Sequence, residues 1–305
     1  MSLSQVRTLI ASLEASPTKR KGQNFLIDAA IARKMVNLLE LEDGDAVIEV
    51  GPGFGALTGL ILAQDEIHGD TRSPKVVQSI GIEIDEKLAR YLNQNFKGES
   101  RFRLIEADIL RYDIRALILE LKGQAHIRRV KVLGNLPYRI STEILFRFME
   151  VSHDLDRMVF SFQREVANRI SAEPGYKDYG IPTLKTQLHC DVLRKLRVPA
   201  SCFFPRPEVD TGVLLLKPHA RYSHLSPSMR ILIGRLIDAA FGKRRKTIKN
   251  ALTSLRGLSY TVKDIEAALT ESGIESRVRA EELPLGAFVQ LAVVLSGRSG
   301  LQAEK

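Results

Sequence analysis

The chain has 305 residues, with 45 Lys and Arg against 36 Asp and Glu, which gives a formal net charge of +9. This length suggests about two domains. An apolar fraction of 44% is enough for a large core and argues against a disordered or collagen-like chain. The excess of positive charge favours a polyanionic partner, most often nucleic acid.

The composition also predicts a cytoplasmic protein without membrane contact, which we expect to be a monomer. Cys190 and Cys202 are too few for a disulfide scaffold and suit a reducing compartment. No apolar run approaches the roughly 18 residues of a membrane span. Residues 1–20 lack the apolar centre of a secretion signal.

Short strands alternate with amphipathic helices through the first two thirds of the chain. The predicted buried strands are residues 46–50, 79–84, 103–106, 130–133 and 158–162. The predicted helices between them are residues 31–41, 56–63, 87–96, 114–121, 143–151 and 164–172. This alternation indicates an α/β fold with an open, doubly wound, mostly parallel sheet.

The pattern changes in the last third of the chain. Residues 192–198 and 209–216 form two strand-like runs whose proline-rich connection has no room for a helix, so they predict an antiparallel pair at one edge of the sheet. Helical patterns follow at residues 227–241, 245–255, 262–272 and 285–296. We therefore divide the chain into a first domain of residues 1–221 and a small helical domain of residues 222–305.

A glycine-rich turn follows the first predicted strand. Residues 49–55 read Glu-Val-Gly-Pro-Gly-Phe-Gly and precede a predicted helix. Glycines such as Gly51 and Gly53 let the backbone turn sharply and approach a ligand closely. The spacing differs from the GxGxxG of dinucleotide-binding dehydrogenases, and the turn lacks the lysine of a phosphate-binding P-loop.

Carboxylates stand at the ends of the first three predicted strands. Glu49 could bind the ammonium group of a cofactor, Glu83 could accept bonds from both hydroxyls of a ribose, and Asp108 could accept one from an adenine amine. Asp85 is the alternative to Glu83. Each acid alone would also fit a helix cap or a solvated loop. Three at the ligand-binding edge of an open α/β sheet predict a nucleoside cofactor.

The turn Asn135-Leu136-Pro137-Tyr138 follows the fourth predicted strand and suits recognition of one exocyclic amine. The Asn135 side-chain oxygen and the Leu136 carbonyl can both accept hydrogen bonds from an NH2 group. Pro137 stiffens the turn, and Tyr138 offers a flat face on which a base can stack. An ordinary strand-to-helix turn would use the same residue types.

Together these motifs resemble the class I S-adenosylmethionine-dependent methyltransferases, and more narrowly the bacterial rRNA adenine N6,N6-dimethyltransferases. The motifs that carry the resemblance run in order along nearly the whole chain: Gly22–Leu26, Glu49–Gly55, Glu83–Asp85, Ala107–Asp108, Asn135–Tyr138, Phe203–Pro207 and Arg244–Lys249. The resemblance implies a Rossmann-like class I methyltransferase sheet and S-adenosyl-L-methionine as cofactor. It implies cofactor contacts from Asn24, Leu26, Gly51, Glu83, Asp108 and Asn135.

The resemblance also implies the substrate, namely N6 of two adjacent adenosines near the 3′ end of 16S rRNA in the small ribosomal subunit or its precursor. A flipped-out base would stack on Tyr138. By resemblance, Phe204 is favoured for the opposite face of the base, while either Phe203 or Phe204 should pack in the core.

Cations near the start of the predicted helix 245–255 are candidates for RNA contacts. They oppose the helix macrodipole, so phosphate binding explains them better than helix stability does. The residues concerned are Lys243, Arg244, Arg245, Lys246 and Lys249.

One departure from the usual spacing and two alternatives remain. Residues 65–75 look like a surface insertion before the second strand, which weakens the assignment of Glu83. An Erm-type methyltransferase of 23S rRNA, which confers macrolide resistance, would use the same site chemistry. A ribosome-assembly factor would act mainly by binding. The six histidines show no metal-ligand spacing, so we expect no metal site.

Overall fold

The computed structural model describes residues 2–13, 23–63, 78–243, 245–253 and 260–298. Contacts divide the chain into one unit of residues 1–167 with 190–218 and another of residues 168–189 with 219–305. The first unit ends at residue 218, close to the expected domain limit at residue 221, but it does not include residues 168–189. Residues 168–189, which we expected in the first domain, group with the helical C-terminal residues.

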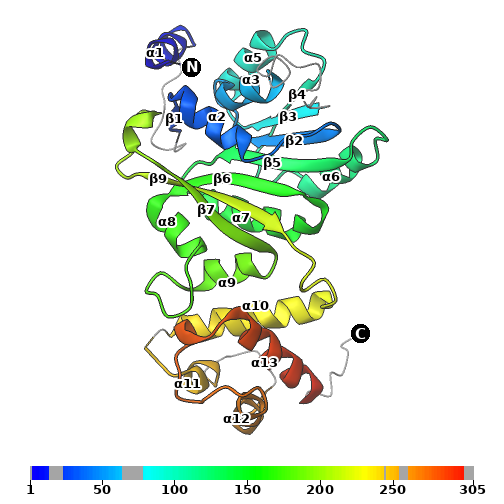
Figure 1. The fold of residues 1–305 in the computed structure, drawn as a ribbon, viewed down its shortest axis with the longest axis vertical. Helices are drawn as coiled ribbons and strands as arrows, with labels where there is room; N and C mark the ends of the chain where they lie inside the picture. Colours follow the sequence, from blue (N-terminus) through cyan, green and yellow to red (C-terminus); the bar gives the residue numbers. More distant parts are fainter. Residues whose placement is uncertain (1, 14–22, 64–77, 244, 254–259, 299–305) are drawn as a thin grey trace. The chain divides into compact units, whose positions relative to one another are not determined.

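A seven-stranded sheet in the order β4-β3-β2-β5-β6-β9-β7 forms the centre of the first unit (Figure 1). Its strands are β2 (Asp45–Val50), β3 (Gln78–Glu83), β4 (Phe102–Glu106), β5 (Arg129–Asn135), β6 (Arg157–Gln163), β7 (Cys190–Val198) and β9 (Thr211–Pro218). The first five pair in parallel, whereas β9 pairs antiparallel with β6 and β7. The predicted sheet and its antiparallel edge are confirmed. β4 at the opposite edge is only partly buried, contrary to expectation.

Helices cover both faces of this sheet. The helical elements along this part of the chain are α1 (Leu3–Ser12), α2 (Ala29–Asn37), α3 (Ala56–Leu62), α5 (Glu86–Asn95), α6 (Ile114–Lys122), α7 (Ser141–Glu150), the 3-10 turn η1 (Ser152–Asp154) and α8 (Arg164–Ile170). Successive strand residues point to opposite faces. Val159 of β6 packs in one cluster with residues of α2 and α3, while the ring of its neighbour Phe160 lies 5.5 Å from that of Phe148 on α7.

Two short strands, which the sequence analysis did not predict, join the N-terminal segment to the loop between β7 and β9. β1 (Phe25–Leu26) pairs antiparallel with β8 (Phe203–Phe204), so that Phe25 lies opposite Phe204. The 3-10 turn η2 (Ala200–Cys202) precedes β8. The N-terminal helix α1 was also missed, although Ser2 and Gln5 form a capping box at its start.

The second unit is helical, as predicted for the C-terminal part of the chain. Its elements are α9 (Ile181–Gln187), α10 (Pro227–Gly242), α11 (Ile248–Leu252), α12 (Val262–Glu271), the 3-10 turn η3 (Ala280–Glu282) and α13 (Leu285–Arg298). The hydroxyl of buried Tyr179 donates to the Leu283 carbonyl at 2.9 Å, which helps to explain why residues 168–189 belong to this unit. Across the described residues, no helix is long and apolar enough to span a membrane.

The predicted helix at residues 245–255 begins later than expected. Thr247 is the N-cap of α11, and its hydroxyl accepts from the backbone N–H of Asn250 at 3.4 Å. A threonine caps a helix better than a cation does, because its oxygen satisfies an N–H that has no partner within the helix. The cations at positions 243, 245 and 246 therefore precede the helix instead of forming its first turn.

A buried ion pair lies toward the amino ends of β2 and β5. Lys131 and Asp45 are 1% and 0% exposed, and the Lys131 Nζ lies 2.6 Å from Asp45 Oδ2. The same Nζ donates to the Glu40 carbonyl at 2.6 Å, and Arg129 Nε donates to the other Asp45 oxygen at 2.8 Å. Such a pair can be tolerated in the core because several hydrogen bonds satisfy both charges.

Replacing Lys131 by Met should therefore destabilise the protein, since Asp45 would remain buried with one cation fewer. We expect the free energy of unfolding in urea to fall by about 3 kcal/mol. Lys122, whose side chain is 44% exposed and pairs with Asp154 at 2.6 Å, supplies the matched control. Lys122→Met should change the same quantity by less than about 1 kcal/mol. Equal losses in the two variants would contradict this account of the core pair.

Candidate active site

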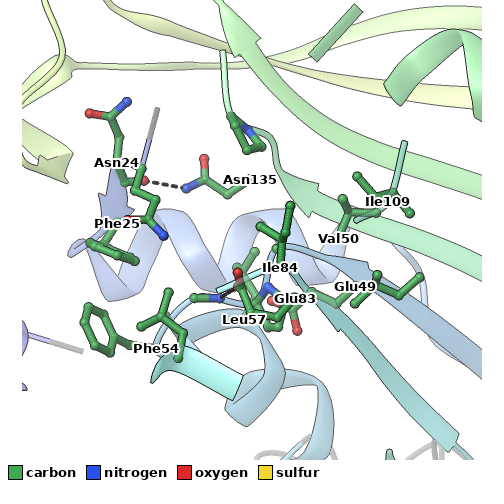
Figure 2. A pocket seen from close by; sticks show the side chains of 18 of the residues that line it. Asn24, Phe25, Glu49, Val50, Phe54, Leu57, Glu83, Ile84, Ile109 and Asn135 are labelled. Carbon is green, nitrogen blue, oxygen red and sulfur yellow. Dashed lines mark hydrogen bonds between the residues drawn. The ribbon is translucent and has the colours of Figure 1, made fainter. Parts of the chain in front are cut away.

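A pocket opens at the carboxyl ends of β2, β3 and β5, where Figure 2 shows side chains converging from these strands and from β1. It is lined by all eight residues that the sequence analysis assigned to the cofactor. These are Asn24, Leu26, Glu49, Gly51, Gly53, Glu83, Asp108 and Asn135. The structure therefore brings the predicted cofactor residues together, although their roles stay a prediction.

The glycine turn takes a backbone shape that other residues rarely adopt. Gly51, Gly53 and Gly55 have φ angles of +65°, +59° and +78°, in the left-handed region that favours glycine. A Cβ on Gly53 would also lie 3.2 Å from the ring of Phe25. The turn thus leaves room for β1 to close over one side of the pocket.

Glu83 is oriented by the backbone around it. It is 5% exposed, and its two oxygens accept from the N–H groups of Gly53 at 3.1 Å and Asp85 at 2.9 Å. Each oxygen can still accept a bond from a ligand hydroxyl. Burial raises the pKa of Glu83 above its usual range.

Asp85, the alternative to Glu83, has a different place. It is the N-cap of α5, and its side chain accepts from the Lys87 N–H at 3.1 Å and from Gln23 Nε2 at 3.2 Å. It is not among the residues that line the pocket. The geometry favours Glu83 over Asp85, and the suspected insertion at residues 65–75 lies outside the described residues.

Asp108 lies two residues beyond the end of β4, not on the strand itself. Its Oδ1 accepts from the Leu110 N–H at 2.9 Å, which holds the side chain in a local turn. Its Oδ2 lies 3.7 Å from the exposed Arg111 side chain. This second oxygen can accept a bond from a ligand amine in the pocket.

Asn135 is the last residue of β5, and both ends of its amide are held. Its Nδ2 donates to the Asn24 carbonyl at 2.8 Å, as drawn in Figure 2. Its Oδ1 accepts from the Ser161 hydroxyl at 2.7 Å. Gly134 precedes it, and a Cβ there would lie 2.6 Å from a Leu136 methyl, so a larger residue would displace the Leu136 side chain.

The other three residues of the Asn135–Tyr138 turn differ in their burial and in their contact with the pocket. The Leu136 side chain is 2% exposed, so a contribution of this residue to a ligand site could come only from its backbone. Pro137 lines the pocket. Tyr138 is half-buried, and its hydroxyl lies 2.6 Å from that of buried Thr211. Burial raises the pKa of Tyr138, so the phenol stays neutral.

Tyr138 and Phe204, the two rings predicted to stack on the target base, are not among the residues that line the described pocket. Phe204 is half-buried beside Val6 and Phe54, and the Arg7 guanidinium lies 5.4 Å from its ring centre. Phe203 is 3% exposed and packs in the core, as expected for one of the pair. No hydrogen bond or ring contact between Tyr138 and Phe204 is seen among the described residues.

The basic residues singled out in the sequence lie in the second unit. Lys243, Arg245 and Lys246 are exposed, and Arg244 lies outside the described residues. Lys249 belongs to α11 and forms an ion pair with Glu266. Lys249 is therefore less available to a phosphate than its exposed neighbours.

Sequence reasoning missed several residues of the pocket wall. Val6 of α1 is fully buried and lines the pocket, and Ile84 lines it although 60% of its surface is exposed. The capping box at Ser2 and the apolar spacing of α1 were available signals. Ile84 carried none beyond its place next to Glu83. No group of three or more potential metal ligands occurs within the described ranges.

Glu49 is a buried acid of the pocket whose pKa is strongly raised. It is 1% exposed, and its Oε2 accepts from the Thr58 hydroxyl at 2.5 Å. Burial raises the pKa of Glu49 to about 7, with a smaller contribution from the nearby Glu83. The folded protein thus holds this proton where an unfolded chain would release it.

This shift predicts a loss of stability as pH rises. Between pH 4.5 and 7 the folded state binds more protons than the unfolded state, so the free energy of unfolding should fall, by about 3 kcal/mol in total. Glu49→Gln removes this ionisation and should make the pH dependence of urea unfolding between pH 4.5 and 7 weaker than in wild type, with the contribution of Glu83 remaining. Glu150→Gln, on the exposed face of α7, should leave it unchanged. Parallel curves for wild type and Glu49→Gln would disprove the raised pKa.

Comparison with known proteins gives consistent relatives. A family model described as "Ribosomal RNA adenine dimethylase" matches residues 16–296. Proteins named "Ribosomal RNA small subunit methyltransferase A" are similar over most of their length. The one from Syntrophus aciditrophicus is 34% identical over 95% of this chain and 98% of its own. The one from Erwinia tasmaniensis is 38% identical over 90% and 91%.

Two solved structures share the fold. A dimethyladenosine transferase from Plasmodium falciparum has a TM-score of 0.72 at 21% identity, covering 90% of this chain and 98% of that one. The 23S rRNA methyltransferase ErmE has a TM-score of 0.63 at 22% identity, covering 90% of this chain and 100% of that one. Both likenesses support the methyltransferase fold.

Proposed function

Because this chain belongs to the ribosomal RNA adenine dimethylase family, we propose that it dimethylates N6 of two adjacent adenosines near the 3′ end of 16S rRNA, with S-adenosyl-L-methionine as methyl donor. The observation that carries the proposal is Asn135, fixed by two hydrogen bonds beside the predicted cofactor residues. We place the activity in the cytoplasm, on the small ribosomal subunit or its precursor, with a monomeric enzyme.

The pocket residues fit S-adenosyl-L-methionine, which supplies an electrophilic methyl group when bound. Glu83 has acceptor capacity left on both oxygens for the two ribose hydroxyls. Asp108 Oδ2 can accept a hydrogen bond from the adenine amine. Ile84 supplies an apolar part of the pocket wall. Glu49, at the end of β2, could bind the ammonium group, whose charge would favour the ionised carboxylate.

Asn135 and Leu136 would hold the amine that receives the methyl group. The N6 lone pair of adenine is delocalised into the ring, so the amine is a poor nucleophile. Two acceptors, Asn135 Oδ1 and the Leu136 carbonyl, would favour a pyramidal amine with its lone pair directed at the methyl group. Catalysis would then come mainly from positioning and electrostatics, without a dedicated general base.

The target base would leave its stack to reach Asn135, and Tyr138 would offset that cost by stacking. The Thr211 contact supports this role, since it holds the Tyr138 ring in one orientation. Phe204, whose ring has Arg7 on one side, would cover the other face of the base. Exposed Lys243, Arg245 and Lys246 would contact phosphates, with Arg244 and Lys249 as further candidates.

Methyl transfer from labelled S-adenosyl-L-methionine tests the proposal directly. Unmethylated small subunits should be labelled, and the product should be N6,N6-dimethyladenosine, whereas large subunits and naked DNA should stay unlabelled. Asn135→Ala should reduce the rate by about a hundredfold or more through loss of positioning. Label on large subunits would favour the Erm-type alternative. RNA binding without any label would favour a binding factor.

Glu83→Ala should weaken the cofactor by about 10- to 100-fold, because hydrogen bonds to a charged acceptor would be lost. Titration calorimetry with S-adenosyl-L-methionine measures this without RNA. Glu106→Ala supplies the control, since Glu106 ends the neighbouring strand β4 but is exposed and does not line the pocket. Equal affinities for wild type and Glu83→Ala would remove Glu83 from the cofactor site.

A further inference from the structure

Ser161 lies directly opposite Asn135 in the parallel pairing of β6 with β5. Side chains at paired positions of neighbouring strands point to the same face of a sheet, so these two must meet. Ser161 is 1% exposed, and its hydroxyl donates to Asn135 Oδ1 at 2.7 Å. The sequence analysis gave Ser161 no role.

The hydrogen bond to Asn24 identifies which end of the Asn135 side-chain amide is the nitrogen and which is the oxygen. The Asn24 carbonyl can only accept, and it lies 2.8 Å from one end of the amide, so that end must be the nitrogen. The oxygen therefore faces Ser161, whose hydroxyl donates to it. An amide oxygen has two acceptor positions, and with Ser161 on one of them the other is left for a ligand amine.

Another buried serine of this sheet makes no such bond. Ser79 of β3 is 0% exposed, and its hydroxyl has no hydrogen-bond partner among the described residues. The Ser161 bond is therefore more than a consequence of burying a hydroxyl in a strand. The final torsion of an asparagine is broad by itself, so a second bond narrows the orientation of the amide considerably.

We propose that Ser161 is a positioning residue for methyl transfer, which holds Asn135 Oδ1 with its free acceptor position toward the target amine. The inference rests on the proposed function of Asn135. Without the Ser161 hydroxyl, the amide keeps one bond to Asn24 and turns about it. The amine would then meet an acceptor that points in the right direction only part of the time.

Paired substitutions of similar shape separate the hydroxyl from the packing. Thr and Val share a shape, but only Thr can donate to Asn135. In single turnovers on small subunits at saturating cofactor, Ser161→Val and Ser161→Ala should be about five- to tenfold slower than wild type, as expected for loss of one hydrogen bond. Ser161→Thr should stay close to wild type. The single-turnover rates are compared at saturating cofactor, so that any change in cofactor affinity through Asn135 does not enter them, and Ser79→Ala should behave as wild type throughout.

A spectroscopic readout tests the same contact without catalysis. In protein labelled with 15N-asparagine, the side-chain amide signals of Asn135 are identified by their loss in Asn135→Ala. They should shift in Ser161→Ala and Ser161→Val, and should not shift in Ser79→Ala. Unshifted signals, or equal rates for Ser161→Thr and Ser161→Val, would overturn the inference. If the signals shift but the protein methylates no rRNA, the proposed function is contradicted while the contact between Ser161 and Asn135 is confirmed.

Discussion

The parallel pairing of β2 with both β3 and β5 is the constraint on which the rest of the first unit depends. It sets the carboxyl ends of three strands side by side, so that Glu49, Glu83 and Asn135 open onto one pocket. The strand order also switches between β2 and β5, because β3 and β4 lie on one side of β2 and β5 on the other, and open α/β sheets leave a crevice at such a point. Residues far apart in the sequence meet there because the register of these strands aligns their carboxyl ends.

The two ends of these strands have opposite electrostatic character. At the amino ends, the charges of Asp45 and Lys131 are buried and paired with each other and with neighbouring groups. At the carboxyl ends, Glu49 and Glu83 are buried and their oxygens can accept further hydrogen bonds. Burial raises the pKa of both carboxyl groups. Buried acids of this kind lower the stability of the folded state, and functional sites are where proteins commonly retain such groups.

The N-terminal segment connects the two halves of the site. β1 brings the Asn24 carbonyl to the amide of Asn135 and at the same time pairs Phe25 with Phe204. The segment therefore contacts the cofactor pocket, the predicted catalytic side chain and the loop of the predicted stacking ring. Val6 of α1 closes the pocket wall next to it. A few residues at the start of the chain thus contact both the pocket and the loop that carries Phe204.

The sequence by itself determined the alternation of strands and helices, the antiparallel edge and eight of the residues that line the pocket. These features follow from local periodicity, from motifs whose glycines and acids stand at strand ends and, for Asn24 and Leu26, from the family resemblance. Only the tertiary structure decided that Glu83 and not Asp85 faces the pocket, that residues 168–189 join the helical unit, and that Ser161 holds Asn135. Each of these depends on a partner distant in the sequence, in a register or packing that no local pattern encodes.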